Sequence, residues 1–117
     1  IDPDYADAHG SLGNVYYILS KYKEAIEAFK QAIRIFPDYA TTHYNLGNAY
    51  GKLSMFKEAI EPYKQAIRIN PDYASAHCYL GIAYLGLNDR GSALEQYKIL
   101  KTLGSKLANM LFNEIYK

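Results

Sequence analysis

The chain has 117 residues, half of them hydrophobic, and its 13 basic and 12 acidic residues leave a formal net charge of +1. Phosphate binding needs clustered Lys and Arg, so this balance argues against nucleic acid and anionic membranes as partners. The apolar content excludes a disordered chain, nothing resembles a signal peptide or membrane span, and the only cysteine, Cys78, cannot form an internal disulfide.

The tetrapeptide Pro-Asp-Tyr-Ala occurs three times at intervals of 34 residues, starting at Pro3, Pro37 and Pro71. A period of this length indicates a supersecondary unit that buries its apolar face only by stacking on its neighbours. We therefore expect one elongated domain over residues 1–117, with repeats at 6–39, 40–73 and 74–104. The chain lacks a start methionine and opens at a position that matches a repeat end, so we expect it to be a fragment of a longer protein.

Each repeat begins with one predicted amphipathic helix. In the first repeat Leu12, Tyr16 and Leu19 follow the spacing i, i+4, i+7, which marks one face of a helix, and the pattern returns 34 and 68 residues later. A polar break then follows in each repeat, at Ser20-Lys21, Ser54-Met55 and Asn88-Asp89.

A second helix is predicted after each break, with Ala25, Phe29 and Ala32 as its periodic positions in the first repeat. Proline follows the second helix in repeats one and two, where it ends the helix because it lacks an amide hydrogen. Asp38 and Asp72 are then expected to cap the next helices. Pro62 falls inside the second helix of repeat two, where we predict a local bend on a solvent-facing side.

These positions resemble the tetratricopeptide repeat family over roughly residues 3–104. The family pattern of Leu-Gly, Tyr, Ala, aromatic, Ala and Pro is matched by Leu12-Gly13, Tyr16, Ala25, Phe29, Ala32 and Pro37, and by Leu46-Gly47, Tyr50, Ala59, Tyr63, Ala66 and Pro71. The resemblance implies an all-α fold, a right-handed α-solenoid of antiparallel helix pairs with about seven helices.

The third repeat departs from the pattern after Tyr97. Leu100 stands where the family has alanine, and Ser105 stands where it has proline. Gly104 can close the preceding helix in a left-handed conformation, and Ser105 can cap a last helix. We therefore predict a capping helix within residues 105–117 that covers the open end of the stack.

Neither a catalytic nor a metal site is predicted, and no cofactor is expected, because no known catalytic or phosphate-binding motif occurs. His9, His43 and His77 occupy one repeat position, but helix axes lie roughly 8–10 Å apart, whereas zinc needs its ligand atoms within about 2.1 Å. Packed or half-exposed roles are expected for these histidines, and a structural role for Cys78.

The family resemblance implies a concave groove lined mainly by the first helix of each repeat. Asparagines there are expected to bond a bound segment, and aromatic and aliphatic side chains to cover its apolar residues. The predicted peptide-binding residues are Asn14, Tyr17, Tyr44, Asn45, Asn48, Lys52, Tyr79, Ile82 and Leu85.

Chaperone-binding members of the family use a clamp of asparagines and basic residues for two carboxylates. Asn14 and Asn45 match that clamp, but Gly10, Ser75 and Tyr79 stand at its three basic positions. Charge-assisted bonds are the strong ones in such a site, so acidic chaperone tails are not expected as ligands.

The leading hypothesis is a non-catalytic scaffold that binds a protein or peptide. Two alternatives stay open: self-assembly into a weak homo-oligomer through repeat stacking, and an accessory repeat domain of a larger enzyme. The compartment is left open, with the cytoplasm slightly favoured.

Overall fold

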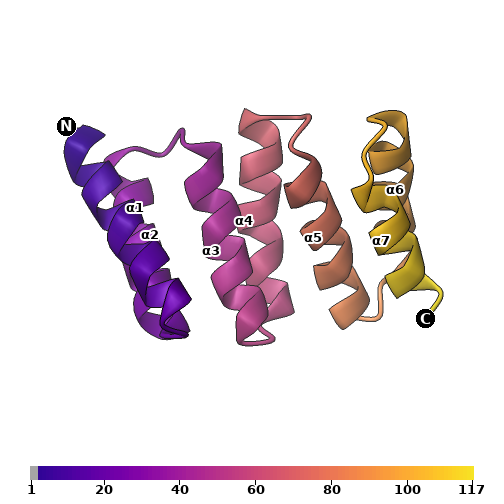
Figure 1. Cartoon of the computed structure of the whole chain (residues 1–117), viewed down its shortest axis with the longest axis horizontal. Helices are drawn as coiled ribbons and strands as arrows, with labels where there is room; N and C mark the ends of the chain where they lie inside the picture. The colour runs from indigo at the N-terminus through magenta and orange to yellow at the C-terminus, as the bar shows by residue number, and fades with distance from the viewer. Residues whose placement is uncertain (1–2) are drawn as a thin grey trace.

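The computed structural model describes residues 3–117, which form seven α-helices and no strand. Figure 1 shows the helix pairs following one another along the longest axis, from α1 and α2 at one end to α6 and α7, which overlap in this view, at the other. The described part measures 42 × 25 × 20 Å. The helices are α1 (Pro3–Ile18), α2 (Tyr22–Ile35), α3 (Ala40–Lys52), α4 (Phe56–Ile69), α5 (Ala74–Gly86), α6 (Arg90–Thr102) and α7 (Leu107–Ile115).

The helices pack as three successive pairs, α1 with α2, α3 with α4 and α5 with α6, and each pair contacts the next through its neighbouring helices. The predicted breaks within the pairs are confirmed, because Ser20, Ser54 and Asn88 adopt left-handed φ values of 60°, 56° and 60°. A left-handed residue ends a helix by turning the chain back on itself. The predicted all-α solenoid of antiparallel helix pairs is therefore confirmed.

The prediction that Asp38 and Asp72 cap the following helices is wrong. The helices α3 and α5 begin two residues after these aspartates, with Tyr39 and Tyr73 at the N-cap positions and no side-chain cap. The Pro-Asp dipeptide instead forms the turn between repeats.

The repeat histidines hold these inter-repeat turns. His43 Nε2 donates to the Pro37 carbonyl at 2.7 Å, and His77 Nε2 donates to the Pro71 carbonyl at 2.8 Å. Both rings are buried, and His9 is half-buried, so the predicted packed or half-exposed roles are confirmed. Each buried ring satisfies a carbonyl left free at the end of the preceding repeat.

The core consists of three clusters, each formed where one repeat meets the next element. Leu46 is 6 % exposed and packs in a cluster with Ala25, Ile26 and Phe29 of α2. Leu80 is 2 % exposed and packs in a cluster with Tyr63 of α4. The equivalent residue of α1, Leu12, is 44 % exposed and has no such helix beside it among the described residues.

Glycines allow the helices of a pair to approach closely. A Cβ atom added at Gly13 would lie 2.5 Å from the Phe29 ring, and one at Gly47 would lie 2.6 Å from the Tyr63 ring. Ordinary contacts between carbon atoms are about 3.5–4.0 Å, so the aromatic rings occupy the space that a side chain would need.

Pro62 lies inside α4 and is buried, so the predicted solvent-facing position is wrong. It stands 34 residues after Ala28, which is also buried, so the same face of the second helix points inward in both repeats. The helix continues through the proline to Ile69.

The helix α7 closes the C-terminal end of the stack by packing against both α5 and α6. Gly104 has a φ of +68° and ends the preceding helix as predicted. The Ser105 hydroxyl accepts a hydrogen bond from the Leu107 amide at 3.1 Å, so Ser105 caps the helix start, although α7 begins two residues later than the capping residue. Leu111 and Ile115 of α7 are buried with Leu100 of α6.

Candidate functional site

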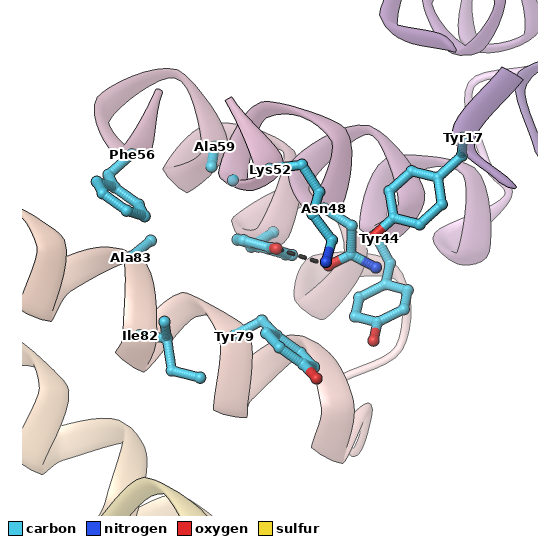
Figure 2. A pocket seen from close by; sticks show the side chains of 11 residues that line it. Tyr17, Tyr44, Asn48, Lys52, Phe56, Ala59, Tyr79, Ile82 and Ala83 are labelled. Carbon is cyan, nitrogen blue, oxygen red and sulfur yellow. Dashed lines mark hydrogen bonds between the residues drawn. The ribbon is translucent and has the colours of Figure 1, made fainter. Parts of the chain in front are cut away.

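A pocket of about 400 Å³ opens between α1, α3, α4 and α5. Figure 2 shows its labelled side chains arranged around a common space. The residues that line it are Tyr17, Tyr44, Asn48, Gly51, Lys52, Phe56, Ala59, Tyr63, Tyr79, Ile82 and Ala83.

Tyr44 occupies the centre of the aromatic wall. Its ring centroid lies 6.1 Å from that of Tyr63, 5.0 Å from that of Tyr73 and 6.2 Å from that of Tyr79. The ring of Tyr17 is supported on its other side by Tyr22, at 5.4 Å and in an edge-on arrangement. Neighbouring rings at these distances restrain one another, so this wall is formed in advance of any ligand.

Asn48 is oriented by a tyrosine from the core. The Tyr63 hydroxyl donates to Asn48 Oδ1 at 2.6 Å, as the dashed line in Figure 2 marks. Burial, together with the neighbouring Tyr44, Tyr17 and Tyr79, raises the pKa of Tyr63, so its hydroxyl keeps the proton that it donates. The Asn48 amide nitrogen has no partner among the described residues, and its two N–H groups remain for a ligand.

Gly51 leaves the pocket open. A Cβ atom added there would meet only the Tyr63 hydroxyl, at 3.9 Å, whereas the equivalent positions in the other repeats carry Tyr17 and Leu85. Lys52 follows Gly51 and stands four residues after Asn48, so both side chains lie on one face of α3. Lys52 is exposed and forms no ion pair in the described part of the chain.

A second hollow of about 610 Å³ lies beside the pocket, toward the N-terminus, and contains Asn14 and Asn45. Asn45 Nδ2 donates to Asn14 Oδ1 at 3.2 Å, which links α1 to α3 across the repeat boundary. The two asparagines therefore satisfy part of each other's hydrogen-bonding capacity.

The structure brings six of the predicted residues into the pocket, and Asn14 and Asn45 into the neighbouring hollow. Leu85 lines neither, because it is half-buried and packs against the C-terminal core cluster of α5, α6 and α7. Sequence reasoning missed Phe56, Ala59 and Tyr63, which come from α4, because the resemblance places the groove on the first helices. The hydroxyl at position 63, where repeat one has Phe29, is the signal that could have identified Tyr63.

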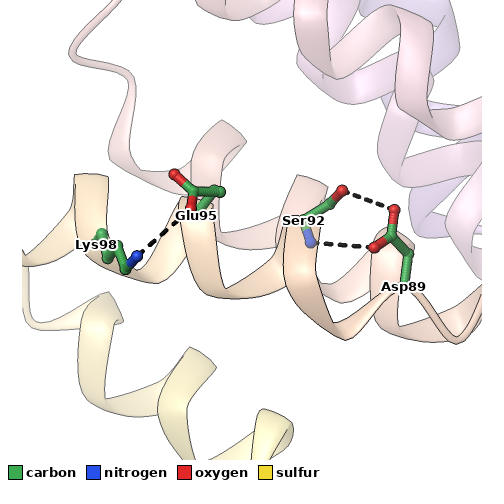
Figure 3. A network of polar contacts seen from close by, with 4 residues as sticks. All are labelled: Asp89, Ser92, Glu95 and Lys98. Atoms are coloured by element: carbon green, nitrogen blue, oxygen red, sulfur yellow. Dashed lines mark hydrogen bonds and ion pairs between the residues drawn. The ribbon is translucent and has the colours of Figure 1, made fainter.

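Other polar groups serve the helices themselves. Figure 3 shows Asp89, which accepts from the Ser92 amide at 3.1 Å and the Ser92 hydroxyl at 2.6 Å and thereby caps α6. These bonds lower the pKa of Asp89. Within residues 3–117 no three His, Cys, Asp or Glu side chains gather closely enough to hold a metal ion, and no helix is long and apolar enough to cross a membrane.

Stacked helix pairs in which each pair contacts the next define the class of helical repeat proteins. The chain belongs to the tetratricopeptide repeat family: the family model "TPR repeat" matches residues 13–54, and the model "Tetratricopeptide repeat" matches residues 40–73. No curated protein matches the sequence significantly.

Solved structures share the whole architecture. The second TPR domain of the human RPAP3 protein, in complex with the HSP70 peptide SGPTIEEVD, is 27 % identical with a TM-score of 0.92, covering 99 % of both chains. The TPR2B domain of yeast Sti1, in a complex with an Hsp70 peptide, is 25 % identical with a TM-score of 0.88, covering 96 % of this chain and 94 % of that one. MamA is 30 % identical with a TM-score of 0.84, covering 92 % of this chain and 63 % of that one.

Proposed function

We propose that the chain is a non-catalytic scaffold that binds a peptide or protein segment in the groove formed by the tyrosine pocket and the neighbouring asparagine hollow. The tetratricopeptide fold is generally a protein-interaction module, and two similar domains were solved with peptides. The observation that carries the proposal is the Asn48 amide, which Tyr63 orients at 2.6 Å while its N–H groups stay unpaired beside an apolar pocket.

The division of roles follows from the chemistry of the groove. Asn14, Asn45 and Asn48 bond the backbone of the segment, because an amide side chain both donates and accepts. Tyr17, Tyr44, Tyr79 and Ile82 cover its apolar side chains, and Lys52 supplies the positive charge. Leu85 contributes by supporting α5 from the core side, since it packs behind the groove.

The test is calorimetric titration of a peptide selected by display on the intact chain. The double variant Asn45→Ala, Asn48→Ala should weaken binding about tenfold or more, because each lost hydrogen bond contributes on the order of 1 kcal/mol. Tyr63→Phe should weaken it less, since it only frees the Asn48 side chain, and the ring itself is tolerated at the equivalent Phe29.

The matched control is Asn109→Ala with Asn113→Ala, which removes two exposed asparagines from α7, away from the groove. The control should bind as tightly as the unmodified chain. Unchanged affinity in the Asn45, Asn48 double variant would show that the segment binds elsewhere.

Self-assembly is the second candidate, and the outer face of α1 supports it. Leu12, Val15 and Leu19 are 44 %, 51 % and 59 % exposed, and together they form an apolar strip that another helix could cover. Light scattering over a concentration series tests this candidate, because a constant monomer mass at high concentration would exclude it.

A further inference from the structure

We infer that the ligand is an internal peptide segment in which an aromatic side chain fills the tyrosine pocket and a nearby acidic side chain pairs with Lys52. This inference rests on the proposed function and names the chemistry of its ligand. It depends on three observations. Aromatic side chains line the pocket, Lys52 is the cation among the lining residues, and Gly10, Ser75 and Tyr79 stand at the basic positions of the carboxylate clamp.

The pocket has room for an aromatic side chain. Tyr17, Tyr44 and Tyr79 present their rings to it, and the buried Ala59 and Ala83 form part of its lining. A volume of about 400 Å³ is at the small end of known ligand pockets. Edge-to-face contacts between aromatic rings add to the gain from simple burial, so an aromatic side chain gains more here than an aliphatic one.

Phe56 closes one end of the pocket and packs against α5. A Cβ atom at Gly86 would collide with its ring, so the ring lies directly against the α5 backbone. The pocket is therefore bounded by Phe56 on this side.

Lys52 favours an acidic side chain in the ligand. The ion pairs among the described residues are Glu27–Lys30, Glu95–Lys98 and Glu114–Lys117, and none involves the pocket. No Asp or Glu lines the pocket, so its positive charge is not compensated from within. An exposed ion pair adds little affinity, but it favours a negatively charged residue beside the aromatic one in the ligand.

The groove does not favour a free carboxyl terminus. The positions at which the clamp has its basic residues are Gly10, Ser75 and Tyr79, and the asparagines Asn14 and Asn45 bond to each other. A terminal carboxylate with an acidic side chain brings two negative charges, which Lys52 alone cannot pair. An internal segment brings one aromatic and one acidic group, which the pocket can match.

The experiment uses a random 12-residue library displayed with its C-terminus fused, so that no free carboxylate is present. The chain is the bait, and selected peptides are then titrated against three variants. Gly51→Leu extends a side chain into the pocket without a backbone clash, because only the Tyr63 hydroxyl lies within 4 Å of the new Cβ atom. Lys52→Glu reverses the charge. Gly91→Leu is the control, an exposed helical glycine on α6 outside the groove.

We expect selected peptides to share Phe, Tyr or Trp within two positions of Asp or Glu. Gly51→Leu should weaken them at least tenfold, and Gly91→Leu should leave them unchanged. Repeating the selection on Lys52→Glu should exchange the acidic residue for a basic one while keeping the aromatic residue. Circular dichroism melting of each variant separates loss of binding from loss of folding.

The failures of the two proposals are distinguishable. Three results overturn the inference: peptides without an aromatic residue, peptides that tolerate Gly51→Leu, and peptides whose charge preference is unchanged by Lys52→Glu. The proposed function still stands in these cases if Asn45→Ala with Asn48→Ala weakens binding about tenfold or more. Peptides that tolerate the asparagine variant as well, or a library that yields no binder, overturn both.

Discussion

Two glycines in α1, three residues apart, should respond to the same substitution with different effects on stability. A Cβ atom at Gly10 would have no neighbour within 4 Å, whereas one at Gly13 would lie 2.5, 2.6 and 3.0 Å from three atoms of the Phe29 ring. We therefore compare Gly10→Ala with Gly13→Ala, which add one methyl group to the same helix.

The magnitude follows from two opposing effects. Replacing a helical glycine with alanine stabilises by about 1 kcal/mol, and this gain is common to both variants. At Gly13 the Phe29 ring must also move by roughly 1 Å to restore ordinary carbon contacts. Phe29 is 1 % exposed and cannot swing into solvent, so overpacking costs about 1–3 kcal/mol. The expected change is about 1 kcal/mol of stabilisation for Gly10→Ala and about 0–2 kcal/mol of destabilisation for Gly13→Ala.

Urea unfolding followed by circular dichroism measures both free energies of unfolding. The difference between the variants isolates the contact with Phe29, because the helix-propensity gain cancels. A third protein, Gly13→Ala with Phe29→Leu, gives the methyl group room and should remove part of the penalty relative to Phe29→Leu alone. Equal stability of Gly10→Ala and Gly13→Ala would refute the view that the close packing of Phe29 against α1 requires glycine at position 13.

Two further perturbations are predicted from the core. Burial, with a contribution from the Glu114 carboxylate, raises the pKa of the Cys78 thiol to about 11. The unfolded thiol ionises near pH 8.5, so the contribution of Cys78 to stability is intact below that pH and is lost as the pH rises toward 11. Cys78→Ala should show a shallower alkaline loss in urea unfolding at pH 8 and pH 10.5, and an equal slope would contradict the burial argument. Pro62→Ala should raise the free energy of unfolding by about 1 kcal/mol. An interior proline destabilises a helix by about 3 kcal/mol, and burial of the proline ring offsets only part of this. A lower urea midpoint for the variant would show that packing of the ring contributes more than the helix penalty.

The helix pairs were predictable because their signals are periodic. Leu46 and Leu80 recur at one spacing and are buried, and the left-handed breaks at Ser20, Ser54 and Asn88 fall where polar residues interrupt that spacing. The caps were mispredicted because Asp38 precedes the helix by two residues, and a turn can use the same Pro-Asp pair. Propensity alone does not distinguish a capping aspartate from a turn aspartate.

The site was only partly predictable, because a repeat position does not specify which neighbour a side chain meets. Asn14 and Asn48 occupy equivalent positions, yet Asn14 accepts from Asn45 of the next repeat and Asn48 accepts from Tyr63 of its own. The difference arises from two changes between the repeats: Phe29 stands where repeat two has Tyr63, and Tyr79 of repeat three stands where repeat two has Asn45. In both cases the side-chain oxygen is paired while the amide nitrogen has no partner among the described residues, so the core hydroxyl of Tyr63 decides only which group orients Asn48.

The C-terminal end of the array also depends on side-chain changes at individual repeat positions. Tyr97 is equivalent to Phe29 and Tyr63, but Gly81 meets Leu111 of α7 instead, at 2.7 Å from its would-be Cβ atom. Leu100 is fully buried where the earlier repeats have alanine, and the Tyr97 ring contacts the Phe112 ring of α7 in a tilted arrangement, with centroids 5.4 Å apart. The larger side chain of Leu100 and the different contact of Tyr97 create a surface that fits α7 and not another regular repeat. The sequence change that ends the repeat pattern therefore also forms the surface on which the capping helix packs.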